Sequence, residues 1–153
     1  MSTELFSDAP ISHAARATQL VEDALAARGV DPCECRLSDD AGGRARYRMP
    51  HGDGALAIEV SPPGGTLLAP VHGRLRVEYP VAPRPSAPTA DTLADLLQRN
   101  ASLVGVAFAL TDESVVLGAE RTVEDLDAMS VSAAIESVVS AAERFGDTDV
   151  TSG

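Results

Sequence analysis

Residues 89–145, TADTLADLLQRNASLVGVAFALTDESVVLGAERTVEDLDAMSVSAAIESVVSAAERF, carry the clearest structural signals in this chain. Their first part predicts a helix, because Thr89 is a good N-cap and Asp91 lies favourably in the first turn. The helical spacing i, i+3, i+4, i+7 is then occupied by Leu93, Leu96, Leu97 and Asn100. Their last part predicts a helix that begins at a Ser130 cap and ends at Gly146, with an apolar stripe of Val131, Ala134, Ile135, Val138, Ala142 and Phe145.

Between these helices the pattern changes to strands. Val104–Leu110 is apolar on both faces, which is typical of a strand covered on both sides and predicts a central position in a sheet. A turn at Asp112–Glu113 leads to a hairpin partner at residues 115–117, and residues 122–125 resemble a capped single helical turn.

Toward the N-terminus, Ser12 is a suitable N-cap for a helix over residues 13–28 that ends at Gly29. From Cys33 to Val81 the period is alternating, which predicts an antiparallel meander with strands near 44–49, 56–60, 66–71 and 74–79. Four prolines in Pro80–Pro88 exclude a central strand there and predict an extended connector.

The predicted order is therefore helix, meander, helix, hairpin and helix. This order indicates an α+β fold in one domain over residues 12–146. The polar leader 1–11 and the tail 147–153 show no periodicity, and we expect both to be frayed.

The composition excludes some classes of function. The formal net charge of the chain is −11, and all of its basic residues are arginine. A nucleic-acid partner is not expected, because such binding depends on basic groups placed against phosphates.

Neither a membrane span nor a basic-then-apolar secretion signal is found, so we expect a cytoplasmic protein. The charge is uneven, at −3 through residue 80 (8 Arg, 11 acids) and −8 after it (4 Arg, 12 acids). This acidity fits either a solvated surface or the selection of basic partners.

The residues with metal-binding or nucleophilic chemistry are few. Cys33 and Cys35 would share one face of a strand, and we expect them to be reduced thiols. His13, His51 and His72 show no ligand spacing to one another or to the cysteines, so neither a metal nor another cofactor is predicted. A small enzyme with a site assembled from Cys33, Cys35 and His72 is one functional hypothesis, and it has less support than the two described below.

Four features of residues 89–145 match a known arrangement. They are the helix end Leu96-Leu97-Gln98-Arg99-Asn100, the strand Gly105–Leu110, Asp125-Leu126 before the final helix, and Ala142-Glu143-Arg144-Phe145 at its end. In these the chain resembles the type III secretion chaperone-like superfamily, which includes CesT-type effector chaperones and YbjN domain proteins. The resemblance implies a homodimeric α+β sandwich without cofactor or catalysis. For the CesT type it also implies a protein partner, such as a secretion substrate, held as an extended segment across apolar patches and a sheet edge.

Three groups of residues are candidates for such binding. Leu67 and Leu68 are adjacent on a predicted strand and so point to opposite faces; with Val71 they would form a partner-binding patch, unless helices or a second subunit cover them. Leu93, Leu96 and Leu97 belong either to the chain's own core or to a dimer seam, which periodicity does not separate. Arg44, Arg46 and Arg48 form either a solvated strand face or a site for an acidic partner.

We therefore predict a non-catalytic protein-binding module with a chaperone-like or adaptor role. The alternative within the same fold is a YbjN-type stress or sensory regulator, whose biochemical act the sequence does not name.

Overall fold

The computed structural model describes residues 9–38 and 43–145. Its helices are α1 (Ala9–Ala27), α2 (Pro32–Cys35), α3 (Ala90–Asn100) and α4 (Ala128–Phe145), with a 3₁₀ turn η1 (Val123–Asp125). An antiparallel sheet has the order β1-β2-β5-β7-β6, formed by β1 (Ala45–His51), β2 (Gly54–Ser61), β5 (Arg74–Pro83), β7 (Ser114–Thr122) and β6 (Ala107–Leu110). A separate hairpin pairs β3 (Gly64–Gly65) with β4 (Pro70–Val71). The predicted α+β class is confirmed.

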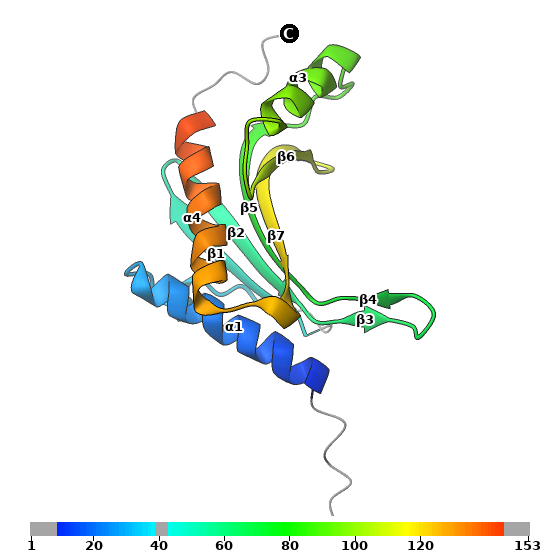
Figure 1. The fold of residues 1–153 in the computed structure, drawn as a ribbon. Coiled ribbons are helices and arrows are strands. Elements are labelled where there is room, and N and C mark those ends of the chain that lie inside the picture. Colours follow the sequence, from blue (N-terminus) through cyan, green and yellow to red (C-terminus); the bar gives the residue numbers. More distant parts are fainter. Residues whose placement is uncertain (1–8, 39–42, 146–153) are drawn as a thin grey trace, which may run out of the picture.

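The sheet and two helices form two layers. α1 and α4 lie on the same face of the sheet, with α4 along β5 and β7 and α1 against β2 (Figure 1). α3 lies at the far end of the sheet beside β6, and the β3–β4 hairpin projects away from the sheet. In the described part of the chain, no helix covers the second face, which we call the outer face.

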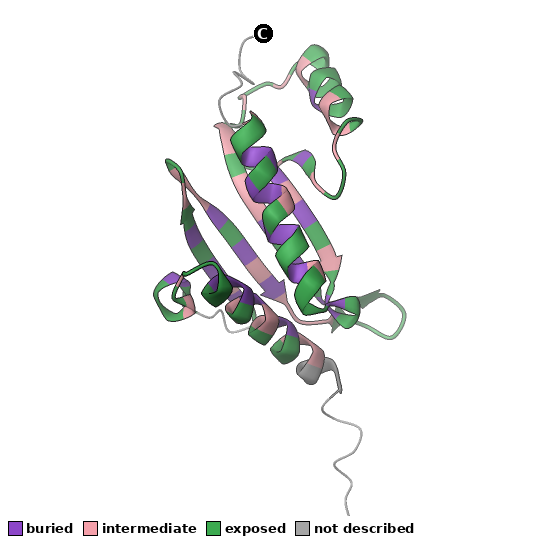
Figure 2. Ribbon diagram, turned by 60° about the vertical axis from the view of Figure 1, so that its left-hand side comes forward, coloured by how far each residue is buried: buried purple, intermediate pink, exposed green. Residues whose placement is uncertain are grey.

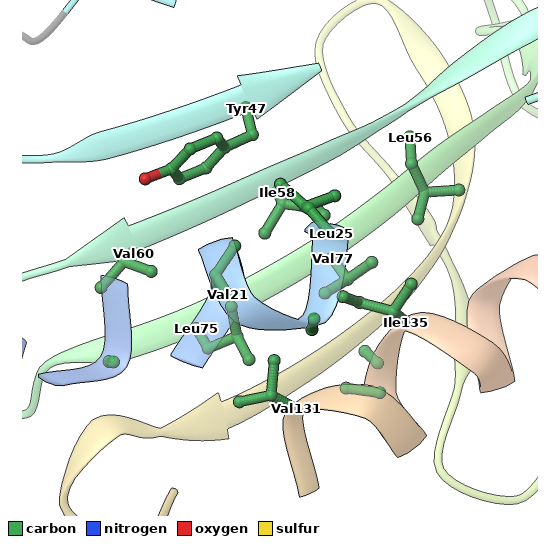
Figure 3. Close-up of a cluster of buried hydrophobic side chains, with 14 of the residues drawn as sticks. Val21, Leu25, Tyr47, Leu56, Ile58, Val60, Leu75, Val77, Val131 and Ile135 are labelled. Carbon is green, nitrogen blue, oxygen red and sulfur yellow. The ribbon is translucent and has the colours of Figure 1, made fainter. Parts of the chain in front are cut away.

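The core lies between the sheet and the two helices. Tyr47, Ile58, Val77 and Ala119 are opposite one another across four strands, and all are buried. Val21 and Leu25 of α1 and Val131 and Ile135 of α4 pack against this inner face (Figure 3). Burial alternates along the strands, as the predicted half-buried strands require (Figure 2).

The ends of α1 differ from the prediction at one terminus only. The helix begins at Ala9, so Ser12 lies inside it and is not its N-cap; residues 1–8 of the predicted leader lie outside the described residues. Gly29 ends the helix as predicted, with a φ of 77°. The Gly29 N–H donates to the Ala26 carbonyl at 2.9 Å and the Val30 N–H to the Leu25 carbonyl at 3.1 Å, which is a Schellman motif.

The prediction of a strand at Cys33 is wrong. Residues 32–35 form a helical turn, because Asp31 caps it through a 2.9 Å hydrogen bond from the Cys33 N–H, and Pro32 fits its first position. The two thiols therefore do not share a strand face. Cys33 is exposed and Cys35 is buried.

The prediction that Pro80 lies in a connector is also wrong, since β5 continues to Pro83. β2 pairs with β5 only as far as the Ala57 and Glu78 pair, and beyond that point β5 pairs with β7 alone. A register shift follows between Pro80 and Ala82. Proline is tolerated there because that side of β5 has no neighbouring strand to receive an N–H.

Val104–Leu110 does not form a central strand. β6 begins at Ala107 and is an edge strand, with Phe108 buried and Ala107 and Ala109 exposed on the outer face. Its hairpin partner β7 is the strand with neighbours on both sides, and the predicted turn at residues 112–113 joins the two. Small alanine side chains made both faces look buried in the sequence, although leaving alanine exposed costs little.

Two further differences concern residues 66–71 and the start of α4. Residues 66–69 form a turn rather than a strand.

The N-cap of α4 is Asp127 and not the predicted Ser130, since the helix begins at Ala128. Asp127 accepts the Ser130 N–H at 2.7 Å, while Ser130 Oγ accepts the Asp127 N–H at 2.9 Å. These hydrogen bonds hold the pKa of Asp127 below its usual value. Gly146 and the predicted tail 147–153 lie outside the described residues.

Candidate protein-binding surfaces

The hairpin of residues 64–71, which we call the arm, carries the most exposed apolar side chains. Leu67 and Leu68 occupy the tip of its turn, which is closed by reciprocal 3.1 Å hydrogen bonds between the backbones of Thr66 and Ala69. Their relative exposures are 103% and 99%, and Val71 is 49% exposed. Within residues 9–38 and 43–145, no side chain covers the two leucines.

The arm depends on a glycine at its base. Gly65 has a φ of 84°, and a Cβ there would lie 2.2 Å from the Ala69 carbonyl oxygen. Only glycine adopts this backbone without strain. The turn that presents Leu67 and Leu68 therefore requires glycine at position 65.

The three leucines of α3 do not share one environment. Leu96 is buried in a second apolar cluster with Phe108 of β6 and Phe145 of α4, whose rings meet edge to face at 5.7 Å. Leu93 is 39% exposed and Leu97 is 69% exposed. Leu96 thus lies in the chain's own core, while Leu93 and Leu97 are available to a second molecule.

A groove that sequence reasoning missed lies between α4 and residues 102–106. It has a volume of about 530 Å³, and its walls include Leu103, Val104, Val106, Ala141 and Phe145. Val104 is 90% exposed at this groove. The only sequence signal was the row of small residues on the outward side of α4, at Ala133, Ser137 and Ser140.

Each edge strand of the sheet has part of its backbone occupied by contacts within the chain. At β6, the Asn100 side chain hydrogen-bonds the backbone N–H and carbonyl of Phe108. At β1, the Leu37 N–H donates to the Arg46 carbonyl at 2.8 Å, and the backbones of Arg36 and Tyr47 form an isolated antiparallel β-bridge. Strand addition by a partner would have to displace these contacts.

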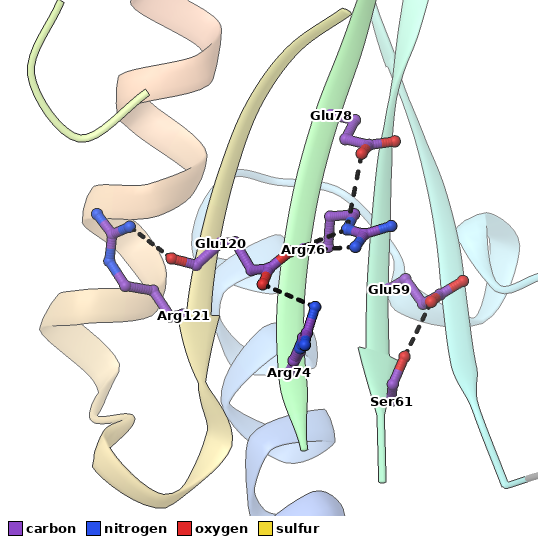
Figure 4. Close-up of polar contacts among 7 residues, drawn as sticks. All are labelled: Glu59, Ser61, Arg74, Arg76, Glu78, Glu120 and Arg121. Carbon is purple, nitrogen blue, oxygen red and sulfur yellow. Dashed lines mark hydrogen bonds and ion pairs between the residues drawn. The ribbon is translucent and has the colours of Figure 1, made fainter. Parts of the chain in front are cut away.

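The outer face of the sheet carries charged residues in register. Arg46, Glu59, Arg76 and Glu120 are opposite one another on β1, β2, β5 and β7. Glu120 contacts Arg74 at 3.2 Å and Arg76 at 3.1 Å, and Arg76 also lies 3.7 Å from Glu78 (Figure 4). The predicted alternation of Arg44, Arg46 and Arg48 with buried residues is confirmed.

The cysteine and histidine residues lie on different elements. Cys33 and Cys35 are on α2, whereas His72 lies at the end of the arm, with its Nδ1 3.4 Å from a Glu124 oxygen. Burial raises the pKa of the Cys35 thiol, with Glu34 and Asp31 adding to the effect. Within residues 9–38 and 43–145, no three His, Cys, Asp or Glu side chains are grouped as a metal site requires.

Comparison with known proteins places the chain in a family. The sequence profile of YbjN, described as "Putative bacterial sensory transduction regulator", matches residues 18–149. This chain belongs to the YbjN family. No curated protein matches the sequence of this YbjN chain. Among its described helices, none combines the length and the apolar character that a membrane span requires.

Two solved structures share the fold of this YbjN chain. One is from the ExsC-ExsE complex, with a TM-score of 0.59, 15% identity, and coverage of 92% of this chain and 98% of that chain. The other is from the HopA1-SchA chaperone-effector complex, with a TM-score of 0.56, 15% identity, and coverage of 90% and 98%. The fold of this YbjN protein is therefore the type III secretion chaperone-like fold, as the resemblance implied.

Proposed function

We propose that this YbjN protein is a non-catalytic, chaperone-like or adaptor module of the cytoplasm that holds a segment of another protein. The observation that carries the proposal is the arm, whose Leu67 and Leu68 are fully exposed at the tip of a hydrogen-bonded turn. Turn positions favour polar or glycine residues, so an apolar pair there costs solubility without serving the chain's own core. The likeness to a chaperone of a chaperone-effector complex supports the same role.

We propose a binding surface other than the sheet edge that the resemblance implied. Contacts within the chain occupy Phe108 of β6 and Arg46 of β1, whereas the arm is exposed among the described residues. The partner segment is therefore proposed to contact the arm first, through Leu67, Leu68 and Val71. A secretion substrate is one candidate partner.

The protein is also proposed to form a homodimer through α3. Leu93 and Leu97 are one helical turn apart and exposed, while Leu96 anchors the same helix to the core. Light scattering is expected to give about twice the chain mass of 15.8 kDa at micromolar concentration. Replacement of both leucines by aspartate is expected to return the mass to that of one chain. A wild-type protein that remains a single chain would refute the dimer.

One paired experiment separates the two surfaces. Tagged wild-type protein, the arm variant Leu67→Asp/Leu68→Asp and the α3 variant Leu97→Asp are each used to capture partners from the native lysate. We expect the arm variant to capture roughly tenfold less, or still less, of a stoichiometric partner, because it no longer has two apolar side chains to bury against that partner. The α3 variant is expected to retain it. Equal capture by wild type and arm variant would overturn the proposed role of the arm.

The second candidate function is a stress or sensory regulator; the description of the family names sensory transduction. It is favoured if wild-type protein captures no stoichiometric partner at either low or high salt. Thermal-shift screening of small molecules against the isolated protein would then be the measurement to make.

A further inference from the structure

A basic hollow lies on the outer face, where the arm leaves the sheet. It has a volume of about 520 Å³. Its charged walls are Arg44, Arg74 and Arg76 together with one acid, Glu59, and Val71 of the arm and the adjoining His72 also line it. Val71 therefore belongs both to this hollow and to the apolar surface of the arm.

The register of the strands explains why the hollow is basic. In the row Arg46, Glu59, Arg76 and Glu120, basic and acidic side chains alternate across the sheet. The next row toward the arm has Ser61, Arg74 and Thr122 on β2, β5 and β7, and contains no acid. The row nearest the arm therefore has no carboxylate of its own, whereas Glu59 and Glu120 lie beside the arginines of the row behind it.

The carboxylates near the hollow differ in their partners. Glu120 is shared between Arg74 and Arg76, and Glu59 accepts a 2.9 Å hydrogen bond from the Ser61 hydroxyl. His72 has Glu124 beside it. Among the described residues, Arg44 has no ion-pair partner. Three arginines, Arg44, Arg74 and Arg76, thus line the hollow against one glutamate, although the chain as a whole carries a net charge of −11.

We infer that this hollow binds a carboxylate side chain of an extended partner segment, beside an apolar residue of the same segment that contacts Val71 and the arm. Arginine is suited to this task because its planar guanidinium group pairs with a carboxylate through two parallel hydrogen bonds. The adjoining apolar surface selects a peptide over a free anion, and the chain's net negative charge disfavours a long polyanion. The inference rests on the proposed function and names the chemistry of the partner: short, acidic and apolar.

An NMR titration tests this inference directly. The probe is the capped peptide Gly-Ser-Glu-Glu-Leu-Ser-Gly, compared with its glutamine counterpart Gly-Ser-Gln-Gln-Leu-Ser-Gly at equal ionic strength. We expect the glutamate peptide to shift the Nε–H signals of Arg44 and Arg74 and the amide signal of Val71. The glutamine peptide is expected to bind roughly three- to tenfold more weakly, as for an exposed but bidentate ion pair.

Matched variants locate the effect. Arg44→Gln is expected to remove the preference for glutamate, whereas Arg99→Gln, with the same change in charge on α3, is expected to retain it. Equal binding of both peptides, or an Arg44→Gln variant that still prefers glutamate, would overturn the inference. Inorganic phosphate that binds the hollow as tightly as the peptide, with no loss when the peptide leucine becomes alanine, would instead assign the hollow to a free anion and also overturn it.

The natural partner distinguishes this inference from the proposed function. If the arm variant loses the partner but Arg44→Gln/Arg74→Gln retains it, the protein-binding function stands and the acidic selectivity fails. If wild-type protein captures no partner, the proposed function itself fails.

Discussion

The Asn100 side chain pairs with the backbone of Phe108 in the way that a neighbouring strand would. Its Oδ1 accepts the Phe108 N–H at 2.6 Å, and its Nδ2 donates to the Phe108 carbonyl at 3.1 Å. Asn100 is the last residue of α3, and Phe108 lies in the edge strand β6. One side chain thus joins the helix end to the sheet and occupies the outward backbone groups of Phe108.

Replacement of Asn100 by alanine is expected to lower the free energy of unfolding by about 1–3 kcal/mol, because two backbone groups lose their partners. Hydrogen exchange of the Phe108 amide should become faster. Gln98→Ala, at an exposed position of the same helix, is the matched control and is expected to leave both measurements unchanged. An unchanged Phe108 exchange rate in Asn100→Ala would show that the edge is protected by something else.

The Gly65→Ala substitution is expected to distort the arm without unfolding the core. A Cβ at Gly65 would meet the Ala69 carbonyl oxygen, whereas one at Gly64 has no atom within 4 Å. Gly64→Ala is therefore the matched control. We expect exchange of the Thr66 and Ala69 amides to rise in Gly65→Ala alone, with a nearly unchanged melting temperature and weaker capture of the partner. A full loss of folding in Gly65→Ala would show that the arm and the core are coupled.

Truncation of Ile135 is expected to destabilise the whole domain. Ile135 is fully buried between α4 and the sheet, so Ile135→Ala should cost about 2–5 kcal/mol in chemical denaturation. Ser132→Ala, on the exposed side of α4, should change the free energy of unfolding by less than about 0.5 kcal/mol. A small effect at Ile135 would place the core elsewhere.

The ion pair between α1 and α4 should depend on pH. Arg28 Nη2 lies 2.6 Å from Glu136 Oε2, and this hydrogen bond lowers the pKa of Glu136 from its usual value. Because the folded-state pKa is lowered, its stabilisation is present above the unfolded pKa and is lost as pH falls through the folded pKa. A double-mutant cycle with Arg28→Ala and Glu136→Ala should give a coupling of roughly 0.2–1 kcal/mol at neutral pH, since the pair is solvent-exposed. The coupling should vanish in acid and weaken in high salt; a pH-independent coupling would contradict this assignment.

The two cysteines should differ in reactivity. Cys33 is exposed, whereas Cys35 is buried and its thiol pKa is raised, so less thiolate forms at neutral pH. Alkylation by iodoacetamide, followed by mass spectrometry, is expected to modify Cys33 first. Modification of Cys35 should accelerate at higher pH or on unfolding. Equal rates in the folded protein would indicate that α2 opens readily.

Several parts of the fold were readable from sequence because they depend on local chemistry. The Thr89 cap, the Gly29 helix end and the alternation of β1 follow from side chains that act within a few residues of their own position. The helical turn at residues 32–35 was predicted wrongly as a strand, because the alternating pattern obscured the helix-start signal of Asp31 and Pro32.

The candidate site was only partly readable. Leu67, Leu68 and Val71 were selected as an exposed patch, and the structure places all three on the arm, but as a turn and a short strand instead of one strand. The spacing of Leu93, Leu96 and Leu97 identified the helix without separating the buried leucine from its two exposed neighbours. The groove beside α4 and the basic hollow were not visible, because each is lined by segments far apart in the chain.

The sequence by itself determined the α+β order, the alternation of β1 and local signals such as the Thr89 cap and the Gly29 helix end, since these depend on spacing and on local hydrogen bonds. Only the tertiary structure decided which strands are neighbours. The edge position of β6, the continuation of β5 through Pro80, and the pairing of Asn100 with Phe108 all depend on segments brought together by packing. The same holds for the gathering of Arg44, Arg74 and Arg76 at the hollow, because strand register, and not sequence spacing, sets which side chains lie side by side across a sheet.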